Sequence, residues 1–211
     1  MKILNLYAGI GGNRKLWSNG NKVVAVEINK KIADEYKDNF PNDEIVVTDA
    51  HQFLLENYED YDFIWSSPPC QSHSKMVKAT RHKIRKFPDM KLYQEIILLQ
   101  HFCKCKWVVE NVKSYYEPLI KPNAILGRHC FWSNFIISYF DVKRPKNFIS
   151  KGTTDATIEL KKWLGLNYNG NLYYDGNHCP GHILRNCVHP KLGLHVYSCA
   201  FKKKQIKLLD Y

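Results

Sequence analysis

The stretch KILNLYAGIGG, residues 2–12, decides the fold class, because a short apolar run leads directly into a glycine-rich turn. Residues 2–7 have the apolar character of a buried strand. Gly9, Gly11 and Gly12 follow, and glycine accepts backbone conformations that other residues avoid. Open α/β sheets bind ligands at the carboxyl ends of their strands, so this turn is a candidate ligand site. A purely structural turn is the alternative interpretation.

Strand-like and helix-like segments alternate along the first half of the chain. Strands are expected at 22–28, 44–49, 61–67 and 106–112, and helices at 13–20, 29–40, 51–58 and 89–104. This order predicts an α/β fold with a parallel sheet and helices on both of its faces.

The pattern loosens after about residue 141. Residues 141–182 are rich in Gly, Asn and Tyr and show no clear period, so we interpret them as an insertion rather than a second core. Residues 184–201 predict a loop and a helix that returns to the sheet. The expected domains are therefore a catalytic domain, 1–140 and 183–211, and a short target-recognition insertion, 141–182.

Composition restricts the class of protein. A chain of 211 residues can form one sizeable α/β domain, and it contains no run near the roughly 20 apolar residues of a membrane span. The N-terminus lacks the long apolar core of a signal peptide, so we expect a cytoplasmic protein whose seven cysteines are mostly reduced. Abundant Lys, Asn, Ile and Tyr suggest an AT-rich source, a bacterium or a phage-infected cell.

Positive charge points to a polyanionic partner. The formal net charge is +11, with 31 basic and 20 acidic residues. Residues 75–86, KMVKATRHKIRK, contain no acid and directly follow a Pro-Pro-Cys corner. Nucleic acid is the usual partner of such a segment, and a generically basic protein is the alternative.

Acidic residues follow the next two predicted strands. Glu27 can accept hydrogen bonds from ribose hydroxyls, and Asp49 can accept one from an adenine amino group. Glycine, acid and acid at three strand ends suit an adenosine-bearing ligand. The turn falls short of GxGxxG, and no Walker lysine is present, so NAD and ATP fit less well.

The corner SSPPCQSHS, residues 66–74, holds a thiol after the fourth strand. Pro68 and Pro69 restrict the backbone, and nearby cations can lower the pKa of Cys70 and make it a nucleophile. An inert cysteine is the alternative, and we assign the other six mostly to packing. The spacing in residues 177–190 is not that of a zinc site, so no metal is predicted. Glu110, at the end of the fifth strand, is a candidate proton donor at the same edge.

Four motifs, LYAGIGGNRKLW, PPCQSHS, VVENV and RNCVHPKLG, resemble the ordered motifs of DNA (cytosine-5)-methyltransferases. The resemblance covers residues 1 to about 135 and 183 to 200. It implies a Rossmann-like fold and methyl transfer from S-adenosylmethionine to a flipped-out cytosine. By this resemblance, we expect Cys70 to add to C6, Glu110 to protonate N3, and Arg128 to contact the flipped base. The implied cofactor pocket is formed by Tyr7, Ala8, Gly9, Gly11, Gly12, Glu27, Ile28, Asp49, Ala50, Pro69, Leu92 and Asn186.

The resemblance also implies that the loop from Gln71 to Phe87 closes over DNA. Its predicted contacts are Gln71, Ser74, Lys75, Lys78, Arg81, Lys83, Arg85 and Lys86. Three positions depart from the family pattern: Tyr7 replaces a phenylalanine, Arg128 stands where two arginines are usual, and Arg185 replaces a glycine. The recognition region is short, which predicts a short or relaxed target site.

We expect a monomer that acts on double-stranded DNA, whether alone or beside a restriction endonuclease. Cytosine-C5 methylation of RNA is the second hypothesis, because a small recognition region demands little contact with a duplex. A nucleic-acid-binding protein without catalysis is the third. Such a protein would not need Cys70, Glu110 and the glycine turn together.

Overall fold

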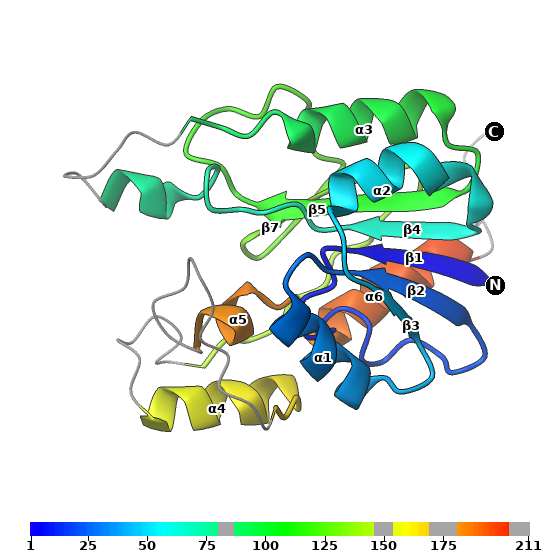
Figure 1. The fold of residues 1–211 in the computed structure, drawn as a ribbon. Helices are drawn as coiled ribbons and strands as arrows, with labels where there is room; N and C mark the ends of the chain where they lie inside the picture. The colour runs from blue at the N-terminus through cyan, green and yellow to red at the C-terminus, as the bar shows by residue number, and fades with distance from the viewer. Residues whose placement is uncertain (80–86, 146–153, 169–180, 203–211) are drawn as a thin grey trace, which may run out of the picture.

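The computed structural model describes residues 1–79, 87–145, 154–168 and 181–202 (Figure 1). The strands are β1 (Lys2–Leu6), β2 (Lys22–Val26), β3 (Glu44–Val46), β4 (Phe63–Ser66), β5 (Lys106–Val112), β6 (Ala124–Leu126) and β7 (His129–Ser133). The α-helices are α1 (Lys30–Asn39), α2 (Ala50–Asn57), α3 (Lys91–Phe102), α4 (Thr154–Leu164), α5 (Gly181–Asn186) and α6 (Pro190–Phe201). Two short 3₁₀ helices, η1 (Tyr58–Asp60) and η2 (Lys75–Ala79), complete the elements.

The strands form one seven-stranded sheet in the order β3-β2-β1-β4-β5-β7-β6. The first five strands are parallel, whereas β7 is antiparallel to both β5 and β6. The mostly parallel, Rossmann-like prediction is therefore confirmed. The strand order reverses between β1 and β4, and such a reversal opens a ligand crevice at the carboxyl ends of the strands.

Helices cover both faces of the sheet, as expected (Figure 1). On one face α2 and α3 pack on Leu4, Leu6 and Val24 through residues such as Leu54 and Leu99. On the other face α6 covers an apolar cluster, and α1 packs beside it. The sheet residues of that cluster include Ile3, Val23, Phe63, Trp65 and Val108. Alternate residues of β1 thus face opposite layers, as expected for a strand buried on both sides.

The helix predicted over residues 13–20 is wrong, because the chain forms turns there. Buried Arg14 reaches Asp43 with Nε and Nη2, at 2.8 and 3.0 Å. Trp17 stacks on Tyr197 of α6, with ring centroids 5.2 Å apart. These distant partners draw the segment into the core and outweigh its local helical pattern.

Two segments distant in sequence meet at the glycine turn. A Cβ added to Gly12 would lie 2.6 Å from the carbonyl oxygen of Val188. A Cβ added to Gly193 would lie 2.3 Å from the carbonyl oxygen of Asn13. The close approach brings α6 and the segment before it against the turn that follows β1, and only glycine permits it at these two positions.

The described part of the predicted insertion packs on residues from the first part of the chain. Leu160 and Leu164 of α4 share an apolar cluster with Ile10 and Ile32, which belong to the glycine turn and α1. Residues 146–153 and 169–180 of this insertion lie outside the described ranges. Among the helices that the structure describes, none has the length and apolar character of a membrane span.

Candidate active site

The turn after β1 has the unusual backbone that its sequence predicts. Gly9 and Gly11 have φ values of 56° and 85°, and Tyr7 also has a positive φ of 55°. The Gly9 N–H donates to Glu27 Oε2 at 3.0 Å, and the Asn29 N–H donates to Oε1 at 3.0 Å. Burial raises the pKa of Glu27, and these backbone donors act in the opposite direction. A buried acceptor is therefore fixed beside an open turn.

The next strand ends carry the other predicted contacts of an adenosyl group. Ile28 is 67% exposed beside Glu27, so it offers an apolar surface for a purine ring. Asp49 caps α2 by accepting from the His51 and Gln52 N–H groups at 2.8 and 3.1 Å. The Gln52 N–H, with help from Lys91, lowers the pKa of Asp49. Its carboxylate stays an acceptor at neutral pH, which suits an amino group.

A buried carboxyl group, which no local sequence pattern marks, supports this side of the site. Glu95 of α3 is 0% exposed and accepts from Tyr7 Oη and Ser66 Oγ, both at 2.6 Å. His51 Nδ1 lies 3.0 Å from Glu95 Oε1. Glu95 thus connects the ends of β1 and β4 with α2 and α3. In the sequence of α3, Glu95 looks like an ordinary surface residue of a helix. Only the fold shows that it is buried and bonded to Tyr7, Ser66 and His51.

The candidate nucleophile and acid lie on adjacent strands. Ser66, the last residue of β4, pairs with Val109 of β5, so Glu110 follows at the same edge as the Pro-Pro-Cys corner. Asn111 Nδ2 donates to the carbonyl oxygen of Pro68 at 3.0 Å, which ties the corner to β5. Glu110 is 6% exposed and Cys70 is half-buried. The fold thus brings the thiol and the carboxyl group together.

Burial, and then the charge of Glu110, raise the pKa of Cys70, whereas Arg128 lowers it. The net direction is opposite to the one we expected from nearby cations. Most of the expected cations, Arg81, Lys83, Arg85 and Lys86, lie outside the described residues. The thiol therefore favours its protonated form, and among the described residues Arg128 is a cation that favours the thiolate.

Arg128 lies in the turn immediately before β7 and has protein partners. Its Nη2 donates to the carbonyl oxygen of Arg185, and its Nε donates to His129 Nε2 at 3.3 Å. His129 Nδ1 lies 2.6 Å from Glu110 Oε1. His129 is not among the site residues predicted from the sequence. Its position next to Arg128 in the sequence could have marked His129 as a candidate site residue. Its orientation toward Glu110, however, depends on the register of β7.

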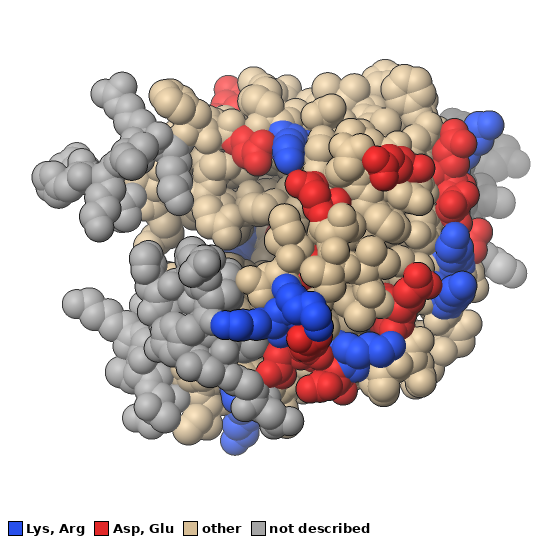
Figure 2. All heavy atoms as spheres, in the orientation of Figure 1, with Lys and Arg blue, Asp and Glu red and all other residues tan. Residues whose placement is uncertain are grey.

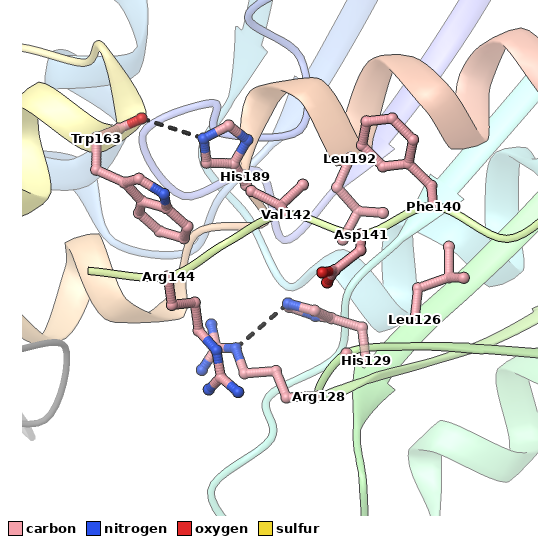
Figure 3. Close-up of a pocket in the computed structure, with 11 residues that line it drawn as sticks. Leu126, Arg128, His129, Phe140, Asp141, Val142, Arg144, Trp163, His189 and Leu192 are labelled. Atoms are coloured by element: carbon pink, nitrogen blue, oxygen red, sulfur yellow. Dashed lines mark hydrogen bonds between the residues drawn. The ribbon is translucent and has the colours of Figure 1, made fainter. Parts of the chain in front are cut away.

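A small pocket adjoins this group (Figure 3). It is lined by residues 126–129, 140–142, Arg144, Trp163, His189 and Leu192. The guanidinium groups of Arg128 and Arg144 lie next to each other in Figure 3. Burial lowers the pKa of Arg128, and Arg144 acts in the same direction. The pocket lining therefore combines two neighbouring guanidinium groups with the carboxyl group of Asp141.

The remaining predicted site residues differ in their exposure to solvent. Ala8, Gly12, Ala50 and Leu92 are buried, whereas Pro69 and Asn186 are exposed. Among the predicted nucleic-acid contacts, Gln71 and Lys75 are exposed, and Ser74 Oγ accepts from the Met76 N–H at 3.2 Å. Ser74 also forms an isolated bridge with Ser114, after β5. The side chain of Lys78 lies outside the described part.

Charge is mixed on the face drawn in Figure 2, where Lys and Arg alternate with Asp and Glu over the described residues. The basic excess is therefore not concentrated there. Within the described ranges, no three His, Cys, Asp or Glu side chains gather as metal ligands. Cys179 and His178, from the segment we weighed as a zinc site, fall outside those ranges.

Comparisons with known proteins agree with this geometry. Residues 1–119 match the family model described as C-5 cytosine-specific DNA methylase. The tRNA (cytosine(38)-C(5))-methyltransferase of Spodoptera frugiperda is 36% identical over 80 residues, 35% of this chain and 24% of the relative. Its human counterpart is 29% identical over 82 residues, 36% of this chain and 21% of the relative. The matches thus span at most about a quarter of these relatives.

A solved structure of S. pombe Dnmt2 methyltransferase is also similar. It is 23% identical, with a TM-score of 0.40, and the alignment covers 56% of this chain and 38% of that chain.

Proposed function

This chain belongs to the family of C-5 cytosine-specific DNA methylases, and we propose that it transfers a methyl group from S-adenosylmethionine to C5 of a flipped-out cytosine in double-stranded DNA. The observation that carries the proposal is the placement of Cys70 and Glu110. The two side chains are close enough that the charge of Glu110 raises the pKa of the Cys70 thiol. They lie at the strand edge that also carries the glycine turn.

The residues at the first three strand ends fit an adenosyl group. Gly9 has open space where a Cβ would lie, and Glu27 offers two carboxylate oxygens beside it. Ile28 supplies an exposed apolar face, and Asp49 supplies an acceptor. When bound, S-adenosylmethionine supplies an electrophilic methyl group. Glu27 holds the ribose, and Tyr7, fixed by its hydrogen bond to Glu95, forms the adjoining wall.

The side chains of the site make C5 reactive. Cytosine C5 is a poor nucleophile until electron density moves onto it. As Cys70 Sγ forms a bond to C6, Glu110 gives a proton to N3, and the ring becomes a neutral enamine with a nucleophilic C5. After methylation, a water molecule takes the C5 proton, the Cys70 sulfur leaves C6 as a thiolate, and the proton on N3 returns to Glu110, which restores the aromatic ring. A stacked base is out of reach of both groups, so the cytosine must leave the duplex first.

RNA is the second candidate substrate, and one observation favours it. The curated relatives from Spodoptera frugiperda and Homo sapiens are named as enzymes of cytosine 38 in tRNA. These matches cover only 80 and 82 residues. The chemistry proposed for Cys70 and Glu110 is the same for either polymer.

A covalent trap tests the chemistry. Duplex DNA containing 5-fluorocytosine, incubated with S-adenosylmethionine, should form a stable adduct with the wild type. The reason is that a base can remove a proton from C5 but cannot remove fluorine, so the Cys70 sulfur cannot be eliminated. Cys70→Ser should form none. Cys105→Ser is the matched control, because Cys105 precedes β5 at the opposite edge of the sheet, and it should form the adduct normally.

Competition between duplex DNA and tRNA tests which of the two polymers is the substrate. Tritiated methyl transfer should go to duplex DNA and should resist an excess of tRNA. Preferential labelling of tRNA would establish the second candidate. No adduct and no transfer with either polymer would contradict methyltransferase activity and favour a protein that only binds nucleic acid.

A further inference from the structure

The ring of His129 lies between Glu110 and Arg128. Val112 of β5 pairs with His129, and Glu110 pairs with Phe131. Side chains two residues apart on a strand share a face, so His129 and Glu110 are diagonal neighbours. His129 Nδ1 is 2.6 Å from Glu110 Oε1, and the residues are only 8% and 6% exposed. A short, buried contact of this kind is a hydrogen bond that water does not replace.

The partner on the other side of the ring assigns its tautomer. Arg128 Nε points at His129 Nε2 from 3.3 Å, the contact drawn as a dashed line in Figure 3. A guanidinium group has donors and no acceptor, so Nε2 must accept. The neutral imidazole then carries its proton on Nδ1 and donates it to Glu110. Both hydrogen bonds therefore run in one direction, from Arg128 through His129 to the carboxyl group.

This arrangement makes the two oxygens of Glu110 different. Oε1 accepts from His129, so the proton that Glu110 gives to N3 in the proposed reaction is carried on Oε2. We infer that His129 is a positioning residue for the proposed reaction, which holds the Glu110 carboxyl group so that Oε2 presents its proton to N3 of the pyrimidine. The inference rests on the proposed function.

The same bond assists the step itself. As Cys70 Sγ bonds to C6, the Oε2 proton moves to N3 and leaves a carboxylate. The Nδ1–H of His129 already faces this developing charge and stabilises it without reorganisation. When the Cys70 sulfur leaves as a thiolate, the proton returns from N3 to Oε2, so Glu110 ends the cycle in the state in which it began it. The C5 proton is a separate one and goes to water.

Three substitutions of His129 separate this role from simple packing. The amide nitrogen of asparagine lies close to the position of histidine Nδ1, whereas that of glutamine lies close to Nε2. His129→Asn therefore keeps a donor for Glu110, and His129→Gln moves it away. His129→Phe keeps the ring near Phe131, whose centroid is 6.2 Å away, and removes both nitrogens.

The assay is tritiated methyl transfer from S-adenosylmethionine to cytosine-containing duplex DNA and tRNA, with kcat and KM measured for each variant. We expect the Gln and Phe variants to lose about 30- to 100-fold in kcat, with KM within about threefold. His129→Asn should stay within about fivefold of the wild type. Thermal unfolding checks each variant, and the Asn–Gln comparison stands even if His129→Phe fails to fold.

Equal kcat values for the Asn and Gln variants, or a fully active His129→Phe, would overturn the inference while leaving the proposed function intact. A wild type that transfers no methyl group to either polymer would contradict the proposed function, and the inference with it. The two failures are therefore distinguishable in one experiment.

Discussion

Replacing Gly193 by alanine should destabilise the protein, although the same change stabilises most helices. In an ordinary helix interior, alanine is favoured over glycine by about 1 kcal/mol. In α6, however, the new Cβ would lie 2.3 Å from the carbonyl oxygen and 2.7 Å from the Cα of Asn13. Both are backbone atoms, so no side-chain rotation relieves the overlap.

Overpacking of a buried contact costs about 1–3 kcal/mol, and more when backbone must move. After the gain in helix propensity is subtracted, we expect the free energy of unfolding to fall by about 1–2 kcal/mol. Urea unfolding followed by circular dichroism measures this, with an unchanged m value if the effect is on stability alone. Because Asn13 follows the glycine turn, S-adenosylmethionine affinity measured by calorimetry should fall as well.

Gly20→Ala is the matched control. An added Cβ there meets nothing within 4 Å, and Gly20 does not have a positive φ. We expect its unfolding free energy to stay equal or to rise by up to about 1 kcal/mol. A Gly193→Ala protein as stable as Gly20→Ala would refute the close approach of α6 to the turn after β1.

Three other changes test the site itself. Glu27→Gln should weaken S-adenosylmethionine binding about tenfold or more by calorimetry, because one carboxylate oxygen becomes a donor; unchanged affinity would remove Glu27 from the pocket. The hydrogen bond to Glu95 raises the pKa of His51, so its stabilising contribution is complete below about pH 6.5 and is lost as pH rises through the higher folded value. Urea unfolding at pH 6 and pH 9 should therefore differ more for the wild type than for His51→Gln, and equal differences would contradict this pairing. Glu110→Gln removes a charge that raises the pKa of Cys70, so alkylation of Cys70 by iodoacetamide at pH 8 should accelerate about 3- to 10-fold; a slower reaction would argue against their proximity.

Much of the fold could be predicted because its signals are local. The apolar run before Gly9 and the alternation of strands and helices gave the mostly parallel sheet. The proximity of Cys70 to Glu110 also followed from the sequence, because parallel strands that are neighbours end at the same edge. To predict this proximity it was enough to know that the strands are parallel, without knowledge of any side-chain contact.

The parts that escaped prediction depend on distant partners. Residues 13–20 look helical, yet Arg14 is held by Asp43, which no local pattern reveals. The orientation of His129 depends on the antiparallel register of β7, and a shift of one residue would turn it away from Glu110. Glu95 occupies a helical position that would suit a surface acid, and only tertiary packing makes it a buried acceptor.

The late position of α6 in the chain has a consequence for biosynthesis. Until Leu192, Val196 and Tyr197 leave the ribosome, one apolar layer of the sheet, including Phe63 and Trp65, lacks the α6 side chains that pack on it. Nascent chains of this protein should therefore remain open and chaperone-dependent until α6 has been translated. Ribosome-bound intermediates arrested before residue 190 should be cut readily by protease, whereas those that already expose α6 should resist.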